Sequence, residues 1–254
     1  MNYKETILLV LSIIMGIGFG SFLNVCIYRT PKKIFFSNKR SFCPKCEHEL
    51  SVKDNIPLFS YIFLRGKCRY CGERISLRYP FVELLNALLW MLVFIKFRIQ
   101  WITLVYMVLV SLLIVMSFID IDTFEIPDRI IVVGIIIALI SFAPIDGIRW
   151  QDKLIGMVAV SLPTFLLAIL TNGMGLGDVK LFFFLGLLFG WQYILIIFFF
   201  AVLIGATIGV IILIKNKKSG LKKEIPFGPS IAVATIITIF VGQYIIKFYS
   251  SLIS

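Results

Sequence analysis

Long apolar runs constrain this chain more than any other feature of its sequence. Eight such runs, mostly about 18 residues or longer, follow one another, and hydrophobic residues make up 59% of the 254 positions. A helix of about 20 apolar residues is long enough to cross the hydrocarbon core of a bilayer. The sequence therefore predicts an all-α polytopic membrane protein with about eight transmembrane helices. The runs cover residues 6–28, 80–97, 101–119, 130–146, 154–171, 179–190, 192–214 and 226–249.

The positive charges predict the orientation of these helices. The net charge is +11, and 12 of the 25 Lys and Arg residues lie between Arg29 and Arg78, with five more (Lys215, Lys217, Lys218, Lys222 and Lys223) before the last run. The positive-inside rule places both loops in the cytoplasm and both termini outside. A basic surface beside anionic lipid explains this charge better than nucleic-acid binding does. We therefore expect membrane lipids as partners and no nucleic acid.

Four cysteines in the first of these loops predict a metal site. Cys43 and Cys46 form one Cys-x-x-Cys pair, and Cys68 and Cys71 form a second pair after 21 intervening residues. Two such pairs are typical of a structural zinc ion held by four thiolates. A redox or disulfide role is disfavoured because the loop is predicted to be cytoplasmic, where thiols stay reduced. The predicted organisation is a first helix over 1–29, a cytoplasmic zinc-binding loop domain over 30–79 and a helical membrane domain over 80–254.

Two aspartates lie at the edges of apolar runs. Asp120 follows the run that ends at residue 119, and Asp178 precedes the run that begins at residue 179. The predicted topology puts both at the cytoplasmic side, where they can meet. Ionisable groups at this depth are costly to keep and indicate a functional site. Two adjacent carboxyls can divide the work of aspartic-protease chemistry, because one activates water while the other acts as an acid.

The residues alone leave alternatives open. Asp122, Glu125 and Asp128 crowd the first aspartate, and a single aspartate at a helix start is commonly a cap. A pair of intramembrane carboxylates also suits a proton-coupled transporter with a zinc-stabilised cytoplasmic loop. These features do not choose between a peptidase and a transporter.

Five motifs, taken in order, resemble those of the bacterial type IV prepilin leader peptidases. Two lie in the first third of the chain, and the others surround the two aspartates and open the last apolar run. Such an ordered set is far more specific than any single motif. They are GSFLNVCIYRTP at 20–31, the loop from Arg40 to Glu83, DIDTFEIPD at 120–128, GLGDVK at 175–180 and IPFGP at 225–229.

The resemblance implies a membrane aspartic endopeptidase. Such enzymes remove the basic leader of prepilins and pseudopilins at the cytoplasmic face of the bacterial inner membrane, in pilus assembly or protein secretion. In the family's motif, the first catalytic aspartate stands six positions before the Ile-Pro step, which corresponds to Asp120 here. The second is the aspartate of Gly-x-Gly-Asp, which corresponds to Asp178.

The resemblance also implies a second activity. Many members methylate the new terminal amine with S-adenosylmethionine, an activity associated with the first helix and the cysteine loop. The sequence shows no Gly-rich turn after a soluble strand, so it predicts no binding residues for this methyl donor. A methyltransferase with a decayed peptidase centre is disfavoured, because both aspartates are present.

Overall fold

The described part of the protein is helical and forms no extended strand. It divides into two compact units, Met1–Val115 and Met116–Ser254. This all-helical architecture confirms the predicted fold class. The computed structural model describes residues 2–34, 41–141, 147–171, 174–215 and 225–253.

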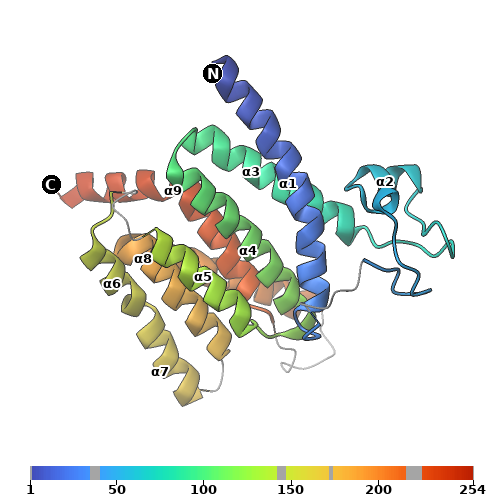
Figure 1. Ribbon diagram of the computed structural model, residues 1–254. Coiled ribbons are helices and arrows are strands. Elements are labelled where there is room, and N and C mark those ends of the chain that lie inside the picture. The colour runs from blue at the N-terminus through green and yellow to red at the C-terminus, as the bar shows by residue number, and fades with distance from the viewer. Residues whose placement is uncertain (1, 35–40, 142–146, 172–173, 216–224, 254) are drawn as a thin grey trace. The chain divides into compact units, whose positions relative to one another are not determined.

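Two helices, α1 (Tyr3–Arg29) and α3 (Arg78–Phe97), pack side by side in the first unit (Figure 1). A capping box begins α1, because Asn2 Oδ1 accepts a hydrogen bond from the Glu5 amide while the Glu5 carboxylate accepts one from the Asn2 amide. Gly16 and Gly20 lie where the helices approach most closely. A Cβ atom at Gly20 would lie 2.6 Å from the Cα of Glu83, so only glycine permits this packing.

Buried polar side chains join the membrane helices of this unit. Asn86 on α3 donates to the Gly16 carbonyl oxygen on α1 at 2.7 Å and accepts a hydrogen bond from the Ser111 hydroxyl on α4 (Trp101–Thr123) at 2.7 Å. Trp90 Nε1 donates to the same hydroxyl oxygen at 2.9 Å. These hydrogen bonds satisfy polar groups that have no water to bond to in an apolar environment.

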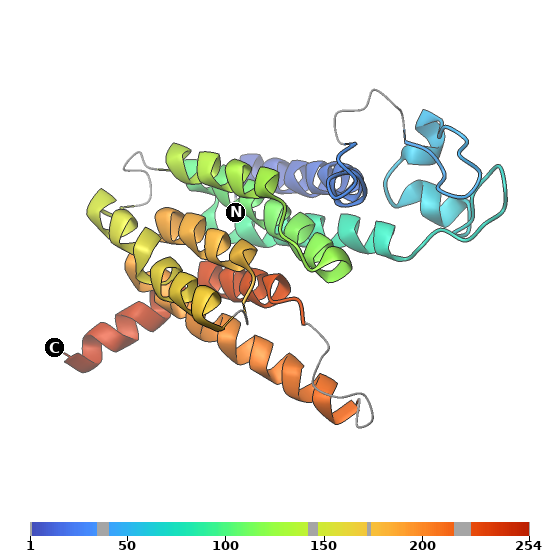
Figure 2. The ribbon, with the colours of Figure 1, turned by 90° about the horizontal axis from the view of Figure 1, so that it is seen from below.

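In its described residues, the polar loop between α1 and α3 forms two short helical turns, η1 (Val52–Asn55) and α2 (Phe59–Phe63). Two isolated backbone bridges, between Phe42 and Glu49 and between Lys67 and Arg74, fold its two halves back on themselves. The loop lies beyond the ends of the helices that flank it (Figure 2).

The second unit is built around α8, which packs against each of the other four helices that lie wholly in it. Gly186 of α8 and Gly156 of α6 meet so closely that a Cβ atom at Gly186 would lie 2.0 Å from the Gly156 carbonyl oxygen. Figure 1 shows α6 and α9 beside α8. The helices of this unit are α5 (Asp128–Ile140), α6 (Trp150–Ala159), α7 (Ser161–Thr171), α8 (Leu176–Lys215) and α9 (Gly228–Ile253).

Within the described ranges, six helical segments are long and apolar enough to span a membrane. The apolar run predicted at 154–171 is divided between α6 and α7, and the runs predicted at 179–190 and 192–214 both lie in α8. Gly190 interrupts α8 with a non-helical conformation (φ 78°, ψ 174°), which is where the sequence predicts the boundary between those two runs. The number of eight spans stays a prediction.

Candidate active site and metal centre

Asp120 lies in the last turn of α4 and is only 4% exposed. The backbone N–H of Gly228, at the start of α9, donates to its Oδ2 at 2.8 Å. The two residues are 108 positions apart in sequence. The sequence placed Gly228 in a motif without giving it a role, and the structure shows that it fixes the Asp120 carboxylate.

Gly228 can approach the carboxylate because it has no side chain. A Cβ atom at this position would lie 2.7 Å from Asp120 Oδ2 and 3.2 Å from its carboxyl carbon. Any larger residue would push the carboxylate away from the amide that holds it.

Asp178 is the third residue of α8 and is 9% exposed. A Cβ atom at the adjacent Gly177 would lie 3.0 Å from the Cβ of Ile126, so the start of α8 packs on the segment that follows α4. The two carboxyl groups lie close enough to interact electrostatically. The structure therefore brings together the two aspartates that the sequence singled out.

Burial distinguishes Asp120 from the acidic residues that follow it. Asp122, Glu125 and Asp128 are all exposed. Asp128 accepts a hydrogen bond from Lys180 Nζ at 2.5 Å in an exposed ion pair. Of the four acidic side chains between residues 120 and 128, Asp120 alone is buried, an arrangement that the sequence left open.

The four predicted ligand cysteines converge in the first unit. The Sγ atoms of Cys43, Cys46, Cys68 and Cys71 all lie within 4.8 Å of one another, and those of Cys43 and Cys71 are 3.9 Å apart. Zinc with four Zn–S bonds of about 2.3 Å places its sulfur atoms about 3.8 Å apart. The donor type, the number of donors and their separation therefore fit a tetrahedral zinc ion.

The two cysteine pairs have matching backbone hydrogen bonds. The amide of Cys43 donates to the His48 carbonyl at 3.0 Å, and the amide of Cys68 donates to the Glu73 carbonyl at 2.8 Å. Each pair thus lies in a turn closed by a backbone hydrogen bond, so both halves of the site have the same backbone support.

A buried carboxylate ties the end of η1 to the second cysteine pair. Asp54 accepts hydrogen bonds from the Ser51 hydroxyl at 2.6 Å, Arg69 Nε at 2.6 Å and the Tyr70 hydroxyl at 3.0 Å. These donors, led by Ser51, lower the pKa of Asp54 to about 2. The Tyr70 ring also packs on His48, with 3.6 Å between the ring centroids.

Two family models match consecutive parts of the chain. Residues 14–97 match the Bacterial Peptidase A24 N-terminal domain, and this range includes the second half of α1, the cysteine loop and α3. Residues 107–210 match the Type IV leader peptidase family and include both aspartates.

Curated proteins are similar over nearly the whole length. A protein of Aeromonas salmonicida (strain A449) is 35% identical, over 92% of this chain and 91% of its own. A protein of Bacillus subtilis (strain 168) is also 35% identical, over 93% of this chain and 95% of its own length. A protein of Pseudomonas aeruginosa is 34% identical, over 94% of this chain and 92% of its own length. Each is named prepilin leader peptidase/N-methyltransferase.

No solved structure matches this chain. The assignment therefore depends on the two family models, on the curated relatives and on the buried aspartates that lie within the second matched region. The chain belongs to the type IV leader peptidase family.

Proposed function

We propose that this protein is a prepilin leader peptidase whose catalytic groups are Asp120 and Asp178. One observation carries the proposal. The single buried carboxylate of the 120–128 segment is held by a backbone amide from α9 and lies within electrostatic reach of a second buried aspartate. Among the described residues, this pair combines burial, proximity and the family motifs.

The chemistry follows from two carboxyls that share one proton. The ionised group takes a proton from water as the water oxygen attacks the carbonyl carbon of the scissile peptide. The protonated group stabilises the resulting tetrahedral intermediate and then donates its proton to the leaving nitrogen as the C–N bond breaks. Gly228 keeps the Asp120 carboxylate from turning away during these steps.

The substrate class comes from the relatives. They are named prepilin leader peptidases. This name favours a peptidase that acts on a prepilin or pseudopilin over a transporter that moves ions. The six long apolar helices support a multi-pass membrane protein. We place it in the bacterial inner membrane with both aspartates at the cytoplasmic face, because the positive-inside rule orients the loops in this way.

The second half of the relatives' name supports N-methylation of the cleaved product. S-adenosylmethionine, when bound, would supply the methyl group to the free terminal amine, with S-adenosylhomocysteine released and the amine proton passed to solvent. Zinc bound by Cys43, Cys46, Cys68 and Cys71 would hold the loop in shape.

Cleavage of a prepilin by the purified protein in detergent tests the peptidase assignment. We expect the wild type to release the leader and both Asp120→Asn and Asp178→Asn to lose at least about 10³-fold in kcat. The exposed Asp122→Asn is the matched control and should cleave as the wild type does. Cleavage by Asp120→Asn with loss in Asp122→Asn would overturn the assignment, and pH-driven ion flux without cleavage would favour a transporter.

A further inference from the structure

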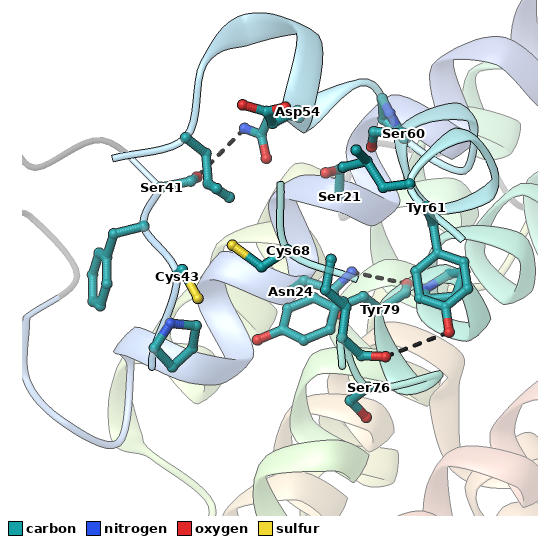
Figure 3. Close-up of a pocket in the computed structure, with 18 of the residues that line it drawn as sticks. Ser21, Asn24, Ser41, Cys43, Asp54, Ser60, Tyr61, Cys68, Ser76 and Tyr79 are labelled. Atoms are coloured by element: carbon teal, nitrogen blue, oxygen red, sulfur yellow. Dashed lines mark hydrogen bonds between the residues drawn. The ribbon is translucent and has the colours of Figure 1, made fainter. Parts of the chain in front are cut away.

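A cavity of about 380 Å³ lies in the first unit, between the cysteine loop and the adjoining ends of α1 and α3. This volume falls within the range of small-molecule sites. Its walls come from α1, from both cysteine pairs and from the first turns of α3, all of which lie within the region matched by the N-terminal family model (Figure 3). Neither proposed catalytic aspartate lines it.

Two buried polar side chains line the cavity from the membrane helices. Asn24 of α1 is 7% exposed, and its Nδ2 donates to the carbonyl oxygens of Gly20 at 3.3 Å and Tyr79 at 3.1 Å. Both N–H groups of the amide are therefore engaged, one within α1 and the other in joining α1 to α3. The carboxamide oxygen accepts no hydrogen bond that the described residues show, and it is the atom left to receive a donor from a ligand.

Glu83 of α3 is also 7% exposed and brings a carboxyl group to the cavity wall. Its Oε2 accepts a hydrogen bond from the Leu58 amide at 2.8 Å, which fixes the orientation of the carboxyl group. A fixed carboxylate in a largely apolar wall favours a ligand that carries positive charge.

Aromatic rings complete the wall. Tyr61 and Tyr79 line the cavity, and the Tyr61 hydroxyl donates to the Ile75 carbonyl at 3.4 Å, which turns its ring toward the space (Figure 3). Aromatic faces bind both flat heterocycles and compact cations. The cavity thus offers one fixed carboxyl group, one amide oxygen that can accept a hydrogen bond, and aromatic surface.

We propose that this cavity binds S-adenosylmethionine, with the Glu83 carboxylate facing the sulfonium or ammonium charge and Asn24 accepting from an amino group. The inference depends on the methyl transfer given under the proposed function. It places the methyl donor entirely within the first unit, on residues that take no part in leader cleavage. The cysteine loop supplies one wall, so zinc bound to the four cysteines would support the shape of this site.

Isothermal titration of the full zinc-loaded chain in detergent tests the site. Glu83→Gln keeps the size of the side chain and an oxygen for the Leu58 amide, and removes only the charge. We expect it to weaken binding of S-adenosylmethionine about tenfold, and to weaken binding of S-adenosylhomocysteine, which lacks the sulfonium charge, clearly less. Glu5→Gln removes the same charge at the far end of α1, where Glu5 pairs with Arg98, and should leave both affinities unchanged.

Unchanged affinity of Glu83→Gln for S-adenosylmethionine would overturn the proposal, and so would an equal loss for both ligands. If this variant does not fold, photocrosslinking of radiolabelled S-adenosylmethionine to the wild type replaces it. Radiolabel crosslinked to residues between 21 and 83 would support the proposed site. Radiolabel confined to residues 116–254 would overturn the proposal. Leader cleavage without any donor binding would refute this inference alone, whereas absence of cleavage would refute the proposed peptidase.

Discussion

At the scale of single residues, the Asp120 carboxylate depends on a glycine 108 positions away. The sequence singled out Asp120 through its place at the end of an apolar run, and it predicted nothing about the amide that holds it. A hydrogen bond between distant residues depends on how α4 and α9 pack, which no local pattern encodes. Burial likewise separates Asp120 from Asp122 only after the helices have packed.

Gly228→Ala should slow leader cleavage while leaving the fold intact. The added Cβ atom would lie 2.7 Å from Asp120 Oδ2 and must displace the carboxylate, and a displacement of about 1 Å typically costs about 10²-fold in rate. We expect this loss in kcat, with little change in KM, because Gly228 positions a proposed catalytic group. Steady-state cleavage of a prepilin substrate measures both constants.

Gly209→Ala is the matched control for that variant. A Cβ atom there meets only Ile225 Cδ1, at 3.6 Å, which is an ordinary contact. Its kcat should equal that of the wild type. Gly228→Ala with wild-type kcat would show that Asp120 does not need this amide.

At the scale of elements, the cysteine loop is held by polar contacts as well as by its thiols. The described part of the loop forms two short helical turns. The hydrogen bonds of Asp54 therefore stabilise it in place of a large hydrophobic core. Asp54→Asn should destabilise the loop by about 1–2 kcal/mol, because four donors lose their charged acceptor. The half-exposed Arg69 keeps this loss small. Thermal unfolding of the zinc-loaded protein measures the change, with the exposed Glu49→Gln as control.

The pKa of Asp54 gives the pH window for this effect. The folded value of about 2 lies below the value of about 3.9 expected in the unfolded chain, so folding favours the ionised form. Its contribution is complete above about pH 4 and is lost as pH falls toward about 2. The difference between the wild type and Asp54→Asn should therefore be the same at pH 6 and pH 8. A difference that changes between these values would mean that another group controls the loop.

At the scale of the whole molecule, the two proposed chemistries lie in separate compact units. The cysteines and the cavity belong to the first unit, whereas Asp120, Asp178 and Gly228 belong to the second. Removal of zinc with a chelator, or Cys43→Ser, should therefore reduce donor binding and methylation at least about tenfold. Leader cleavage per folded molecule should stay within about twofold of the wild type, because no zinc ligand contributes to the aspartate pair.

Metal content by atomic absorption, together with cleavage and methylation at matched folded yield, tests this separation. Wild-type methylation after complete zinc loss would contradict the role given to the loop. Normal yield of Cys43→Ser with abolished cleavage would contradict the independence of the aspartate pair.

The sequence alone predicted the apolar helices, the thiolate chemistry of the proposed metal ligands and, through the family motifs, the two aspartates. These properties reside in local composition and in short motifs, since apolar length specifies a membrane helix and paired Cys-x-x-Cys turns specify a thiolate site. Tertiary structure alone decided which carboxylate is buried, which amide fixes it and which side chains enclose the cavity. Those properties arise from contacts between residues far apart in sequence, such as Asp120 with Gly228 and Leu58 with Glu83, and only packing brings such residues together.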